Sequence, residues 1–205
     1  MLKNKKMLIL AIIFFIIIMI IIFIYFIFFK NNMAKSFKIG NNTSSQEIVD
    51  YILNIKAYET VVDVETKSNK NENKYVIKQN YNGEDENLQE ILEPANIQGV
   101  KIIRSGKTLK LENTNLKLTS IFENYDYLSQ NCLDLSSFIE EYKNDVNSKW
   151  EEKNGQIIMK TNLSKDMKKE LYISKENGKP VKMNIEDANK KTAIYILYRE
   201  VNVNS

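Results

Sequence analysis

Two acidic side chains at alternate positions, Asp63 and Glu65, are the sequence's candidates for catalysis. Residues at i and i+2 of a β-strand point to the same face, so this spacing brings two carboxylates together if the segment is a strand. Two carboxylates that face one cleft are what glycoside hydrolysis requires. The same spacing is also typical of a solvated strand face whose acidic residues pair with lysines on a neighbouring strand. The second interpretation is favoured, because nothing beyond the spacing supports catalysis.

Other reactive residue types give weaker candidates. The chain has no His, which excludes a Ser-His-Asp triad, a Cys-His pair and a His-ligated metal site. Its one cysteine, Cys132, cannot form an intrachain disulfide or a thiolate zinc site, and we interpret it as a small, partly buried residue. The run Glu84-Asp85-Glu86 lacks the spacing and glycine of an EF-hand loop and is interpreted as an exposed hairpin tip. We therefore expect a protein that is not an enzyme, with no catalytic, cofactor-binding or metal-binding residues.

The strongest signal is an unbroken run of apolar residues from Met7 to Phe29. As a helix it would extend about 35 Å, enough to cross a hydrocarbon core of about 30 Å. The run is longer than the apolar core of a signal peptide and no A-x-A site follows it, so we expect a retained signal anchor, with cleavage as the alternative. The predicted organisation is a cytoplasmic tail at 1–6, a transmembrane anchor at 7–29, a linker at 30–43 and an extracytoplasmic domain at 44–205. The protein would then be a single-pass membrane protein.

The net charge of +3 belongs to the N-terminal tail. Lys3, Lys5 and Lys6 precede the apolar run, and the rest of the chain holds 26 basic and 26 acidic residues. A neutral domain held at a membrane does not favour nucleic acid as a partner.

Two segments have the spacing of amphipathic helices. Ser44 to Glu47 matches a capping box, and the apolar residues that follow at i, i+3, i+4 and i+7 predict a helix over 45–56. A second apolar stripe, from Leu135 to Val146, predicts a helix over 135–146 with Asp134 as its N-cap.

The rest of the domain alternates between apolar and polar residues and predicts about nine to eleven strands. Asn154-Gly155 has the composition of a type I′ hairpin turn, and Ser105-Gly106 and Asn177-Gly178 mark further turns. Because no strand-helix-strand unit repeats, the fold class is α+β, with one strongly curved antiparallel sheet and about two helices on its concave face. The strands are expected at 57–67, 74–81, 88–93, 100–104, 107–111, 149–152, 156–163, 170–174, 179–187 and 192–203, with Leu116, Leu118 and Ile121 continuing the sheet.

The final strands also carry a family resemblance. Leu171-Tyr172-Ile173, the stretch from Gly178 to Met183, and Tyr195 to Val203 resemble the closing strands of LolA-like lipoprotein-carrier proteins. Leu88 to Pro94 (LQEILEP) resembles another strand of that family. More narrowly, residues 44–203 are similar to the clostridial germination lipoprotein GerS and its relatives. The chain departs from GerS because it lacks a lipobox cysteine, and the apolar run takes the place of the lipid.

The resemblance implies a half-open β-barrel with helices on its concave side. For GerS-like proteins it implies a non-catalytic role in spore cortex biogenesis or germination, through a cortex amidase (CwlD-like) as partner. For LolA-like carriers it implies an apolar cavity that accepts acyl chains, and a core filled by Ile48, Ile52, Phe138 and Tyr142 would argue against that alternative. Open sheet edges can also pair with each other, which makes a homodimer a further expectation.

Overall fold

The computed structural model describes residues 43–83, 86–124, 133–162, 167–187, 189 and 192–204. The predicted tail, the anchor at 7–29 and all but the last residue of the predicted linker lie outside these residues. Among the helices in the described part of the chain, none has the length and apolar character needed to cross a membrane.

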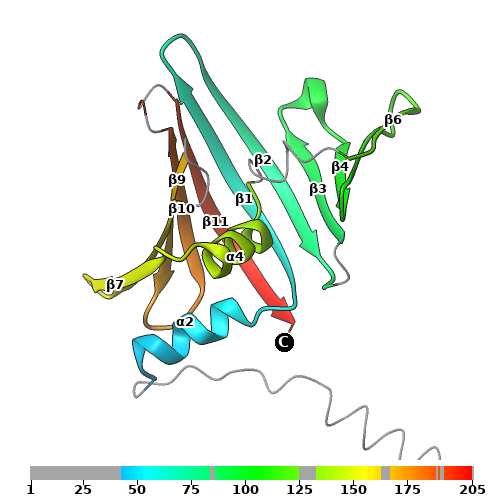
Figure 1. The fold of residues 1–205 in the computed structure, drawn as a ribbon. Helices are drawn as coiled ribbons and strands as arrows, with labels where there is room; N and C mark the ends of the chain where they lie inside the picture. The colour runs from blue at the N-terminus through cyan, green and yellow to red at the C-terminus, as the bar shows by residue number, and fades with distance from the viewer. Residues whose placement is uncertain are drawn as a thin grey trace, which may run out of the picture. The chain divides into compact units, whose positions relative to one another are not determined.

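Eleven antiparallel strands form one sheet in the order β6-β5-β4-β3-β2-β1-β11-β10-β9-β8-β7 (Figure 1). The sheet does not close, because β6 and β7 each have one neighbour. The strands are β1 (Ala57–Ser68), β2 (Glu72–Tyr81), β3 (Glu86–Glu93), β4 (Val100–Ser105), β5 (Thr108–Asn113), β6 (Leu118–Phe122), β7 (Lys149–Lys153), β8 (Gln156–Thr161), β9 (Met167–Ser174), β10 (Pro180–Asp187) and β11 (Thr192–Asn204), with a 3-10 turn, η1 (Ala95–Ile97), after β3.

The first predicted helix is α2 (Ser45–Leu53), and its capping box is present. The Ser44 hydroxyl accepts a hydrogen bond from the backbone N–H of Glu47 at 3.2 Å, and the Glu47 carboxylate accepts one from the backbone N–H of Ser44 at 2.7 Å. The second helix is α4 (Leu135–Asn144), capped by Asp134 as predicted.

Both helices end before their predicted last residues. After α4 the Asp145 carboxylate accepts hydrogen bonds from the backbone N–H groups of Asn147 and Asn162, each at 2.8 Å. These bonds turn the chain away from the helix axis, so the expectation that Val146 continues the apolar stripe is wrong. Val146 is 95% exposed.

The core lies between the two helices and the concave face of the sheet. Figure 1 shows α2 and α4 on the same face, and both contact β8. Alternate residues of β1 are buried from Tyr58 to Val64, as the sequence pattern predicts. The helices contribute Ile48, Ile52 and Phe138, each with no exposed surface, and this burial is the main source of stability for the fold.

Two strands depart from simple alternation. The register between β9 and β10 shifts between Pro180 and Lys182, so Pro180 is buried and Val181 is half-buried. Alternation along β10 predicts that Val181, Met183 and Ile185 share the buried face, and this is wrong for Val181, since only Met183 and Ile185 are buried. In β11 the register with β1 skips Arg199, because Val61 pairs with Glu200 and Val62 pairs with Tyr198. An extra residue of this kind is a β-bulge, which bends the strand that carries it.

Candidate functional site

The predicted carboxylate pair is held on the outward face of β1 by cations. The Arg199 Nε donates to the Asp63 carboxylate at 2.7 Å, and its Nη2 contacts the other oxygen. The Glu65 carboxylate lies 2.8 Å from the Lys67 Nζ, and this hydrogen bond lowers the pKa of Glu65. Both acids are therefore ion-paired on a partly exposed strand face, but the partner of Asp63 is an arginine and the nearest cation to Glu65 belongs to its own strand, not to a neighbouring one as expected.

We expect Asp63→Asn to change the free energy of unfolding by less than about 1 kcal/mol, because exposed ion pairs contribute about 0–1 kcal/mol. The Asp63 side chain is 36% exposed and that of Arg199 is 50% exposed. Urea denaturation followed by circular dichroism measures the change. A loss of several kcal/mol would show that the pair has a larger structural role than its exposure indicates.

The other chemical candidates give no site in the described residues. Glu84, Asp85 and Cys132 lie outside them. Within the described ranges, no group of three or more His, Cys, Asp or Glu side chains is placed to hold a metal ion.

A buried polar network joins the start of α4 to the β3–β4 part of the sheet. Asp134 has no exposed surface, and its carboxylate accepts hydrogen bonds from the Ser137 backbone N–H at 2.8 Å and from the Ser136 hydroxyl at 2.6 Å. The Arg104 guanidinium donates to the same carboxylate at 3.3 Å and to the Ser137 hydroxyl at 2.7 Å. This network fixes where α4 begins on the sheet. Asp134 was expected as a cap from its position before the apolar stripe, whereas no local pattern indicates that Arg104, 30 residues away, contacts it.

The space between the helices and the sheet is filled by side chains. Ile48, Ile52 and Phe138 have no exposed surface and Tyr142 is 7% exposed, and all four belong to one core cluster. These are the residues whose packing was expected to argue against an acyl-chain cavity. The described core therefore gives no support to the carrier alternative.

The far end of the sheet carries apolar side chains that remain exposed. Leu116 is 65% exposed, Leu118 is 62% exposed, Ile121 is 60% exposed and Phe122 is 40% exposed. We call these four residues the β6 surface. Leu118 and Ile121 pair with β5 and continue the sheet as predicted, whereas Leu116 lies in the turn before β6, so the prediction is wrong for Leu116. All five residues of β6 are exposed, and the strand contributes no residue to the core.

The register shows that the β6 surface covers both faces of an edge strand. Leu118 pairs with Asn113 and lies on the face that carries Arg104, which is the concave face, whereas Ile121 pairs with Lys110 and lies on the convex face. In the described part of the chain, both α-helices pack on β8, at the other end of the sheet (Figure 1). The apolar side chains of β6 thus have neither α-helix over them.

The two edge strands of the sheet differ in composition. β7 has the sequence Lys-Trp-Glu-Glu-Lys, and charged edge strands resist pairing with other chains. β6 has the sequence Leu-Thr-Ser-Ile-Phe and carries no charge. An uncharged edge with exposed apolar side chains is typical of an interaction surface.

Comparison with known proteins finds similar structures. No protein-family model and no curated protein matches the chain. The chain is similar in structure to a LolA superfamily protein from Nitrosomonas europaea (TM-score 0.46, 14% identity, 80% of this chain and 94% of that chain). It is also similar to a putative outer membrane lipoprotein-sorting protein domain from Vibrio parahaemolyticus (TM-score 0.46, 13% identity, 78% and 92%).

A third similar structure is the CwlD amidase from Clostridioides difficile in complex with the GerS lipoprotein (TM-score 0.44, 20% identity, 80% of this chain and 95% of that chain). The resemblance to LolA-like proteins, GerS among them, is therefore found in the comparison of structures as well as in the sequence. At these identities the likeness concerns the fold.

Proposed function

We propose that this protein is a non-catalytic binding protein of the cell envelope, held at a membrane by residues 7–29, which binds a partner protein through the β6 surface. The observation that carries the proposal is the exposure of Leu118 and Ile121, both at least 60%, on opposite faces of an uncharged edge strand. Exposed apolar groups that gather on one strand are stabilised when a partner removes them from water.

A protein fits this surface better than an acyl chain. Leu118 and Ile121 point to opposite faces, so a single chain of methylene groups could not contact both without wrapping around the strand. A partner that pairs with β6 or clasps its edge contacts both faces at once.

The partner class follows from the sequence resemblance over residues 44–203. We propose a cortex amidase of the CwlD type as the partner and spore cortex biogenesis or germination as the process. The domain would then lie outside the cytoplasm, in the compartment where the cortex is made. A deletion strain that forms normal cortex would contradict this part of the proposal and would leave the β6 surface as a binding surface for another protein.

The binding surface is tested by charge substitution. We expect the full chain in detergent micelles to bind a purified cortex amidase, and Leu118→Asp with Ile121→Asp to weaken binding at least tenfold, because each 1.4 kcal/mol lost is tenfold in affinity. Biolayer interferometry measures the change. Val146→Asp is the matched control, because Val146 is also apolar and is more exposed, at 95%, but lies outside β6.

Three further results would contradict the proposal in different ways. Equal weakening by the β6 variant and by Val146→Asp would mean that the interface lies elsewhere. Light scattering that shows a dimer of the full chain, lost in the β6 variant, would assign the surface to self-association instead of an amidase. Binding of a radiolabelled fatty acid that saturates at one site would favour the carrier alternative.

A further inference from the structure

The sheet is split between β10 and β11. The ladder between these strands covers five pairs, from Lys182 with Leu197 to Glu186 with Ala193. β11 then continues to Asn204, and along this stretch it remains paired with β1. In the described residues, β11 from Tyr198 onward therefore has a strand partner on one edge, whereas the edge toward β10 has none.

Two irregularities at the same level of the sheet separate the strands. On one side, β10 carries the register shift at Val181 and begins at Pro180, which has no backbone N–H to donate to a neighbour. On the other side, β11 carries the extra residue Arg199, whose side chain is held outward by Asp63. Bulges bend a strand and increase its twist. The two strands therefore diverge beyond the pair of Lys182 with Leu197, toward Pro180 on β10 and toward Asn204 on β11.

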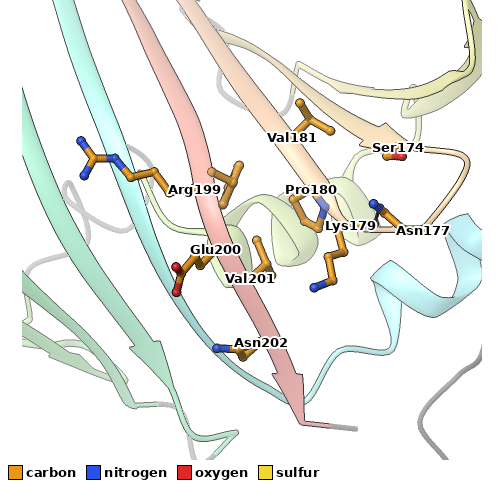
Figure 2. Close-up of a pocket in the computed structure, with 10 residues that line it drawn as sticks. Ser174, Asn177, Lys179, Pro180, Val181, Arg199, Glu200, Val201 and Asn202 are labelled. Atoms are coloured by element: carbon orange, nitrogen blue, oxygen red, sulfur yellow. Dashed lines mark hydrogen bonds between the residues drawn. The ribbon is translucent and has the colours of Figure 1, made fainter.

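A pocket of about 340 Å³ occupies the split. Figure 2 shows Lys179, Pro180 and Val181 on the β10 side, and Glu200 and Asn202 on the β11 side. The volume falls in the range of about 300–1,000 Å³ that is usual for ligand sites. The pocket is independent of the β6 surface, which lies at the end of the sheet on strands that do not line it.

The walls of the pocket favour a peptide backbone with polar side chains. Residues 198–202 span about 13 Å at about 3.3 Å per residue, so an extended segment of about five residues matches the open edge. Lys179 and Glu200 are exposed, have opposite charges and form no ion pair with any described residue. A segment that carries both a carboxylate and an ammonium group complements this pair of charges, which an acyl chain does not.

We propose that the split between β10 and β11 binds an extended, mixed-charge segment of a partner polypeptide, which adds as a strand to the open edge of β11. Backbone hydrogen bonds to β11 supply the affinity, and Lys179 and Glu200 select the charges. The bound segment becomes the neighbour of β11 on the edge from which β10 diverges. The ladder between β1 and β11 does not change.

The probe is the capped peptide acetyl-Lys-Val-Thr-Val-Glu-amide, added to the full chain in detergent micelles. Hydrogen exchange followed by mass spectrometry is expected to show slower exchange in residues 198–202 and unchanged exchange in β6. A second peptide of the same sequence is N-methylated at alternate residues, which removes backbone donors and keeps the side chains. We expect this peptide to bind at least about tenfold more weakly, because it loses two or more hydrogen bonds.

Two tryptophan variants locate the site. Asn202→Trp fills the pocket from the β11 side and should abolish peptide binding. Asn73→Trp is the matched control, because Asn73 is also an exposed asparagine on a strand but does not line the pocket, and it should bind the peptide as the parent chain does.

Three outcomes would overturn the proposal. The first is no protection of residues 198–202 at millimolar peptide. The second is equal binding of the N-methylated peptide, which would indicate a site for side chains or small polar molecules instead of a strand. The third is equal binding by the two tryptophan variants, which would place the peptide elsewhere.

Discussion

Replacement of Lys169 by methionine should lower the free energy of unfolding by about 3–5 kcal/mol, because it leaves a buried carboxylate without its cation. Lys169 is 1% exposed although it is a lysine in the middle of β9. Its Nζ donates to the Glu141 carboxylate of α4 at 2.5 Å, and Glu141 is 8% exposed. Methionine fills nearly the same volume as lysine, so the lower free energy of unfolding would come from removal of the positive charge and not from a cavity.

The double variant Glu141→Leu with Lys169→Met should recover stability to within about 1 kcal/mol of the parent chain, or exceed it. Burying an ion pair costs desolvation of both charges, so replacing both partners with apolar side chains is often neutral or stabilising. Guanidinium denaturation followed by circular dichroism measures both variants. A double variant as unstable as Lys169→Met would show that packing at this site, and not the unpaired charge, causes the loss.

The contribution of Glu141 and Lys169 to the free energy of unfolding should also depend on pH. Burial raises the pKa of Glu141 above its usual 4.5 in spite of the opposing effect of Lys169. A carboxyl whose pKa is higher in the folded state binds its proton more tightly there, so its contribution to stability is present below about pH 4.5 and is lost as the pH rises through the folded pKa. In Lys169→Met the pKa should rise further. Acidification toward pH 4.5 should therefore stabilise that variant relative to the parent chain.

Much of the fold could be predicted because it depends on local patterns. The alternation of Tyr58, Thr60, Val62 and Val64 predicts which face of β1 is buried, and that face is buried. Asn154 and Gly155 were expected to form a type I′ turn, and both have positive φ, as this turn requires. The capping box before α2 is formed by residues three apart, so the sequence contains everything that the motif needs.

The features that the sequence did not reveal depend on distant residues. Nothing near Lys169 distinguishes it from Lys168, and its burial follows only from the position of Glu141 on α4. The split between β10 and β11 arises from two bulges on different strands, and an alternating pattern cannot show that a ladder stops. β6 was predicted as a strand, but its exposure depends on where both α-helices pack.

The buried cap of α4 should be the second large determinant of stability. We expect Asp134→Ala to cost about 3–5 kcal/mol, because it removes the N-cap and leaves Arg104 without the carboxylate that it contacts. Asp134→Asn should cost less, because the amide oxygen can still accept the hydrogen bond from the Ser137 backbone N–H at the start of the helix. Thermal and urea denaturation in detergent measure the stability of the full-length parent chain and of the two variants, Asp134→Ala and Asp134→Asn.

The matched control is Ser44→Ala, which removes the N-cap of α2. Ser44 is exposed, and no cation depends on it, so the expected loss is about 1 kcal/mol, the usual value for a cap. The difference between the two caps then measures what burial and the Arg104 contact add. If Asp134→Ala costs no more than Ser44→Ala, the network between α4 and β4 contributes little, and α4 is held on the sheet by its buried apolar side chains, Leu135 and Phe138 among them, and by the pair of Glu141 with Lys169.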